Sequence, residues 1–217
     1  MKHFALISFL FCLTLTGCPS SPPPQTAPSI AVSTQASDWS LLYGIGLPAH
    51  PAPVGTGWQF TIPTNSGAVH YVTVPYTPAV PILGKTVTMT FDVHSAAPVY
   101  NALIEPGEVG PPSLHLFLQR AGDNFTGQGQ YQYYRWWCAA SQYLLGSRDN
   151  QIITVSCPLV STSWTSVYGK TDPTDFAAAL QNLQSVGLTF GGSDGWGHGV
   201  NLTSGTAQFQ MMSYAIR

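Results

Sequence analysis

Charge is what this sequence has least of. Lysine, arginine, aspartate and glutamate together make up 7% of its 217 residues, against about 25% in a typical soluble protein. With only 7 basic residues, the chain lacks the release of counterions that drives nucleic-acid binding, so nucleic acid is excluded as a partner. A folded surface must instead be covered by uncharged polar residues, chiefly Thr, Ser, Asn, Gln and Tyr.

The zinc-protease motif is also missing, since the sequence contains no His-Glu-x-x-His. Asp92 and His94 share one face of a strand beside threonines, and alone they make neither a zinc site nor a triad. Glu105 and Glu108 lie in a loop, a poor place to hold an acid and a base in register. We therefore expect no catalytic residue, metal or cofactor. A glycan-cleaving enzyme stays open, because it needs only two acidic residues brought together by the fold.

The N-terminus carries an export pattern. After Met1-Lys2-His3, an apolar run from Phe4 to Thr16 is too short to span a bilayer but fits a signal peptide. The run ends in Leu15-Thr16-Gly17-Cys18, which resembles the lipobox of bacterial lipoproteins. The resemblance implies that residues 1–17 are removed and that Cys18 is acylated. An ordinary signal peptide ending by chance in Gly-Cys is the alternative.

Lipidation of Cys18 would place the protein in a bacterial cell envelope, tethered to a membrane. No aspartate follows Cys18, and in lipoproteins this implies the outer membrane if the bacterium is diderm. The stretch 18–37 is rich in proline and small polar residues and cannot bury enough apolar surface to order itself, so it predicts a disordered linker. A single globular domain is expected over residues 38–217.

The cysteine count predicts one disulfide. Of the four cysteines, Cys12 lies in the signal peptide and Cys18 at the lipidation position. Cys138 and Cys157 remain, and disulfides persist in exported proteins, so we expect these two to pair.

The globular part alternates apolar and polar residues with period two, the pattern of half-buried strands. In "KTVTMTFDVHS", for example, Val87, Met89 and Phe91 share one face. One segment has helical spacing instead, near residues 173–183, with Asp172 as N-cap and Pro173 at the first position. The sequence predicts an all-β antiparallel sandwich, a jelly roll, with one short helix.

The C-terminal third runs in the order short helix, "VGLTF" strand, Gly-rich loop and long final strand. It is similar to the closing segment of jelly-roll carbohydrate-binding modules and galactose-binding-like domains. The resemblance implies a jelly roll with a saccharide ligand. Many such modules hold a calcium with an acidic residue in the last strand. Ser213-Tyr214-Ala215-Ile216 stands there, so calcium is not carried over.

The run "YQYYRWWC" is the best candidate for a binding site. If it is a strand whose Cys138 faces inward, alternate side chains point outward. With His115 and Gln119 on a neighbouring strand, they would form an aromatic patch edged with hydrogen-bond donors, the chemistry of a saccharide site. The outward set is Tyr131, Tyr133, Arg135 and Trp137. The alternative is that these aromatic residues simply pack under a helix or loop.

The Gly-rich loop from Gly191 to Val200 offers Trp196 and His198 as rim residues, since glycine lets the backbone approach a ligand closely. A tight corner between strands is the alternative interpretation. Taken together, the sequence predicts a lipid-anchored domain that binds polysaccharide. A structural envelope lipoprotein, docking a protein partner through the same aromatic face, is the second hypothesis.

Overall fold

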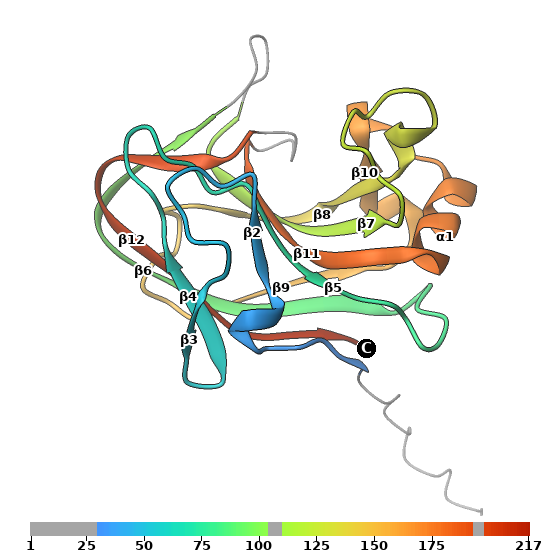
Figure 1. Ribbon diagram of the computed structural model, residues 1–217, viewed down its shortest axis with the longest axis horizontal. Helices are drawn as coiled ribbons and strands as arrows, with labels where there is room; N and C mark the ends of the chain where they lie inside the picture. Colours follow the sequence, from blue (N-terminus) through green and yellow to red (C-terminus); the bar gives the residue numbers. More distant parts are fainter. Residues whose placement is uncertain (1–29, 104–109, 193–197) are drawn as a thin grey trace, which may run out of the picture.

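The computed structural model describes residues 30–103, 110–192 and 198–217, and it folds into two antiparallel sheets packed face to face (Figure 1). Sheet A, in spatial order, contains β3 (Ala52–Val54), β4 (Gly57–Thr61), β12 (Val200–Ile216), β6 (Thr86–Ala102) and β9 (Ile153–Pro158), with β1 (Ile30–Ala31) beside the end of β12. Sheet B contains β10 (Trp164–Ser166), β8 (Arg135–Leu144), β7 (Ser113–Arg120), β11 (Leu183–Gly191), β5 (Tyr71–Pro75) and β2 (Ser40–Leu42).

The rest of the described secondary structure is helical and short. It consists of η1 (Ala36–Asp38), η2 (Gly129–Tyr133), η3 (Ser161–Ser163), η4 (Val167–Gly169) and the single α-helix, α1 (Pro173–Gln181). Across the described ranges, no helix is long and apolar enough to cross a membrane.

Alternation along the strands builds the core between the sheets. On β6, Val87, Met89 and Phe91 are fully buried, while the threonines between them lie on the outer face. On β7, Leu114, Leu116 and Leu118 face the same interior from sheet B. The chain crosses repeatedly between the sheets, as β4 to β5 to β6 to β7 illustrates. The predicted antiparallel β-sandwich of the jelly-roll class is confirmed.

The disulfide joins the two sheets. Cys138 on β8 bonds to Cys157 on β9, and both are buried in the main core, so the predicted pairing is confirmed. Helix α1 covers the same end of the sandwich (Figure 1), where Phe176 contacts Trp136 with ring centroids 5.0 Å apart. The Asp172 carboxylate accepts from the backbone N–H groups of Thr174 and Asp175, which confirms the predicted N-cap.

The fold starts earlier than the sequence suggested. Ile30 pairs with Ile216 at the end of β12, and Val32 and Ala36 are buried in the core. Residues 30–37 therefore belong to the folded domain rather than to the predicted linker. The apolar residues Ile30, Val32 and Ala36 lie among polar ones without a sustained period, which hid their role in the sequence.

The strand predicted over Tyr131–Cys138 is also shorter than expected. β8 begins at Arg135, and the preceding residues form the 3₁₀ helix η2. Gly127 and Gly129 have φ of 64° and 58°, a left-handed conformation that glycine adopts freely and that coils the chain just before the strand. The alternation of faces therefore holds from Arg135 to Cys138 and does not extend back to Tyr131 and Tyr133.

Candidate functional site

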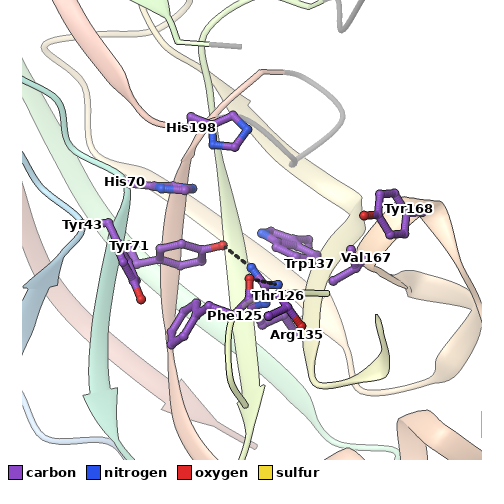
Figure 2. Close-up of a pocket in the computed structure, with 10 residues that line it drawn as sticks. All are labelled: Tyr43, His70, Tyr71, Phe125, Thr126, Arg135, Trp137, Val167, Tyr168 and His198. Atoms are coloured by element: carbon purple, nitrogen blue, oxygen red, sulfur yellow. Dashed lines mark hydrogen bonds between the residues drawn. The ribbon is translucent and has the colours of Figure 1, made fainter. Parts of the chain in front are cut away.

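A hollow of about 730 Å³ lies on the outer face of sheet B (Figure 2). This volume is within the range of ligand sites, about 300–1,000 Å³. Aromatic rings dominate its lining, with one arginine and two histidines, and none of the described lining residues is Asp or Glu. The lining comprises Tyr43, His70, Tyr71, Phe125, Thr126, Arg135, Trp137, Val167, Tyr168 and His198.

The floor of the hollow is built by register between neighbouring strands. Phe117 on β7 lies opposite Trp137 on β8, and their ring centroids are 5.7 Å apart. Tyr71, on β5, contacts Phe117 with centroids 4.9 Å apart. These three residues pack with Val167 into a second apolar cluster, separate from the core between the sheets. Trp137 is only 3% exposed and Tyr71 only 4%, so the floor is a rigid support.

The rim carries the exposed rings. Tyr43 directly follows β2 and is 60% exposed, and Tyr168 follows β10 and is 68% exposed. Because β2 and β10 are the two edge strands of sheet B, these tyrosines stand at opposite ends of the hollow, with Tyr71 and Trp137 between them (Figure 2). The hollow therefore runs across the strands.

Three of the lining aromatics have unusual backbone conformations. Among the described residues, six that are not glycine have positive φ, and Tyr43 (53°), Phe125 (61°) and Tyr168 (61°) are half of them. The left-handed region costs a residue with a Cβ about 1–2 kcal/mol, and for a bulky residue it is a genuine outlier. Such strain gathers at ligand sites, where the surrounding structure holds it.

Arg135 lies in the wall of the hollow and joins several elements. Its Nε lies 3.2 Å from the Asp123 carboxylate, an ion pair whose N–H is not aligned as a hydrogen bond. Nη1 donates to the Tyr71 hydroxyl at 3.3 Å, and Nη2 donates to the Phe125 carbonyl at 3.0 Å. The guanidinium thus fixes both the floor and the loop that carries Phe125.

The Tyr71 hydroxyl can serve a ligand. Burial raises the pKa of Tyr71, and the adjacent Arg135 only partly opposes this. The phenol is therefore protonated at neutral pH. Since its oxygen already accepts from Arg135, its O–H remains available to donate toward the hollow.

The structure brings three of the predicted site residues together. Arg135, Trp137 and His198 all line the hollow, although they come from β8 and from the segment just before β12. His198 lies beside His70, with ring centroids 6.1 Å apart. Trp196, the other predicted residue of that loop, lies outside the described residues.

Two further predicted residues lie on the same sheet face but do not line the hollow. Gln119 lies on the strand next to β8, as predicted, and is opposite Arg135. Its side chain is buried. Its side-chain amide donates to Asp123 and its oxygen accepts from the Ser185 hydroxyl. His115 is buried as well, with Nδ1 2.9 Å from the Cys138 carbonyl oxygen. Both lie in the support beneath the surface.

Tyr131 and Tyr133 lie in η2, away from the hollow. The Tyr133 ring stacks on Trp136 at the edge of the main core, with centroids 6.3 Å apart. The Tyr131 ring contacts Tyr134, over which Arg120 is placed. These contacts are those of ordinary packing, the alternative given above for the aromatic run.

Sequence reasoning missed most of the lining of the hollow. Tyr71 is part of the alternating strand "YVTVP", but nothing in the sequence says that this strand lies beside β11 and near β8. Phe125 and Tyr168 stand alone in the polar, Gly-containing stretches "DNFTG" and "VYGK". A large aromatic residue at a turn was the available signal, since turns favour Gly, Asn, Asp and Ser.

Comparison with known proteins adds little. No protein family matches the sequence, and no curated protein is similar to it. A solved structure described as "xylan-binding module CBM15" has a similar shape, with a TM-score of 0.44 and 11% identity, over 86% of this chain and 97% of that one. A likeness this loose carries no inference about the ligand.

Proposed function

We propose that this domain binds saccharide in the hollow on sheet B, without catalysis. The observation that carries the proposal is the backbone of Tyr43, Phe125 and Tyr168. Each is a large aromatic residue in a left-handed conformation, and all three line the same hollow. Glycine or asparagine would suit these turns better for stability alone, so we infer that the rings are kept for a ligand.

The chemistry of the lining supports a sugar. Aromatic rings stack on the apolar faces of pyranose rings, and the polar groups of Arg135, Tyr71 and Thr126 can bond the hydroxyls. Two exposed rings, Tyr43 and Tyr168, belong to a concave site rather than to a flat apolar patch, which would favour a protein partner.

The ligand we propose is an extended chain. Tyr43 and Tyr168 follow the two edge strands of a six-stranded sheet, and neighbouring strands lie about 4.8 Å apart, so these two strands are roughly 24 Å apart across the sheet. A monosaccharide could contact only one end. An oligosaccharide lying across the strands would contact both tyrosines and the floor between them.

A binding screen tests this proposal. The exported chain from Cys18 onward, made with Cys18→Ser, contains every described element. We expect it to bind at least one polysaccharide, and we expect calorimetry with oligosaccharides of that polymer to give an affinity that rises with length until both tyrosines are covered. No binding to any polysaccharide would reject the proposal and favour the protein-docking hypothesis.

We also propose that the domain is held at a membrane by lipid on Cys18, in a bacterial envelope. Leu15-Thr16-Gly17-Cys18 and the apolar run before it support this. In bacteria expressing the full chain, wild type should incorporate radiolabelled palmitate and sediment with membranes, whereas Cys18→Ala should do neither. Equal labelling of the two proteins would contradict lipidation at Cys18.

A further inference from the structure

Apart from two histidines, the described lining of the hollow has one cationic residue, Arg135. A buried carboxylate neutralises its charge from inside the protein. Arg135 is 9% exposed, and its partner Asp123 has a side chain with no exposed surface. Asp123 does not line the hollow. Its contact with Arg135 therefore places a negative charge just behind the wall, where a ligand cannot reach it.

The carboxylate of Asp123 is fixed on three sides. One oxygen accepts from the Phe125 backbone N–H at 3.0 Å, and the other accepts from the Gln119 amide at 3.0 Å and faces Arg135. Gln119 is held in turn by the Ser185 hydroxyl. Together these contacts hold the Asp123 carboxylate against Arg135.

Arg135 nevertheless keeps hydrogen bonds to offer. A guanidinium has five N–H groups. Two of them donate to Tyr71 and to the Phe125 carbonyl, and the buried Nε–H faces Asp123 without a hydrogen bond, which leaves one N–H on each of Nη1 and Nη2. The remaining groups can donate to sugar hydroxyls. A sugar carboxylate would lose its hydration on entering the hollow. Because Asp123 neutralises Arg135, the attraction of the pair for this carboxylate would not offset the free energy of desolvation.

We propose that the hollow selects uncharged saccharides and that Asp123 is the residue that sets this specificity, by cancelling Arg135. The inference rests on the proposed saccharide binding. It makes Asp123 a positioning residue, because Asp123 would change which sugar binds without touching the sugar. Removing its charge should turn the same hollow into a site for acidic sugars.

The experiment compares glucan, mannan and galactan with the same polymers oxidised at C6 to uronates. Binding to the chain from Cys18, made with Cys18→Ser, is measured at pH 8, where free imidazole is uncharged. Wild type should prefer the neutral polymers, with an affinity that hardly changes with salt. Asp123→Asn should shift the ratio toward the oxidised forms by about tenfold or more, in a salt-dependent way.

Three variants make the comparison specific. In Asp123→Asn, the new side chain can still accept from the Phe125 N–H, and Gln119 can rotate its amide to accept from it. Asp123→Asn with Arg135→Gln removes both charges and should restore the neutral preference. Asp38→Asn removes one charge beside β3 and β4 of sheet A and should change nothing.

The outcomes separate the two proposals. Wild type that binds oxidised polymers better, or an Asp123→Asn variant with an unchanged ratio, would overturn the role of Asp123 while saccharide binding stands. Wild type that binds no polymer in either form would overturn both. If Asp123→Asn does not fold, a wild type that prefers oxidised polymers, or whose binding depends strongly on salt, still overturns the proposal.

Discussion

The variant carrying both Tyr43→Gly and Tyr168→Gly is expected to bind saccharide about a hundredfold more weakly than wild type, at nearly unchanged stability. Stacking on an aromatic side chain is worth about 1–3 kcal/mol per nucleobase, and an equal contribution from a sugar ring makes each tyrosine worth about tenfold in affinity. Both rings are largely exposed, so little packing is lost. Calorimetry gives the affinity, and thermal unfolding gives the stability.

Stability should hold because two effects oppose each other. Glycine removes the left-handed penalty of about 1–2 kcal/mol per residue, while the greater freedom of the unfolded chain costs about 0.4–1 kcal/mol at each site. Ala97→Gly is the matched control, since Ala97 also has a positive φ, of 46°, but lies on β6 of sheet A. It should leave binding unchanged. A double glycine variant that unfolds far below wild type would mean that the rings serve packing.

Replacing both disulfide cysteines by alanine is expected to lower the free energy of unfolding by about 3 kcal/mol, since the bond closes a loop of 19 residues. For a domain of this size, that corresponds to a fall in Tm of roughly 6–12 °C. The effect should be confined to stability, because Cys138 faces the core while its neighbour Trp137 faces the hollow.

Reduced wild type is the control for this second prediction. It should unfold at the same temperature as the alanine variant, and both should bind saccharide normally at temperatures where they are folded. An unchanged Tm after removal of both cysteines would show that packing of β8 against β9 alone holds the two sheets at this end of the sandwich.

The local sequence pattern was enough to predict the fold class, because a half-buried strand must alternate apolar and polar side chains. Trp58, Phe60 and Ile62 share one face in the sequence and are all buried in the structure. The disulfide followed from counting, and α1 from the Asp172 cap. The start of the domain could not be predicted from the sequence, since β1 has only two residues and is formed by pairing with β12.

The candidate site was predicted only in part, for a physical reason. Arg135 and Trp137 were found because Cys138, at most three residues away, fixed the face of the strand on which each side chain lies. Tyr43, Tyr71 and Tyr168 depend on the order of strands in sheet B, which brings together residues far apart in the chain. Tyr131 and Tyr133 were included wrongly as members of the same strand, because Gly127 and Gly129 start a helical turn there.

The structure also changes which substitution is informative. Trp137 is the most prominent aromatic of the sequence motif, but it is 3% exposed and packed against Phe117. Truncating a buried tryptophan to alanine costs about 3–5 kcal/mol. Loss of binding in such a variant would not distinguish a missing contact from a damaged floor. The exposed tyrosines at the rim avoid this difficulty.

The most direct test of the account is to locate the bound saccharide by NMR, adding the polysaccharide fragment found in the screen to the isotope-labelled domain. If saccharide binds in the hollow, the amide signals that shift belong to residues around it, with the largest changes near Tyr43, Phe125 and Tyr168. Shifts confined to the outer face of sheet A, around Thr88, Thr90 and Gln208, would contradict it and place the ligand on the opposite side of the sandwich.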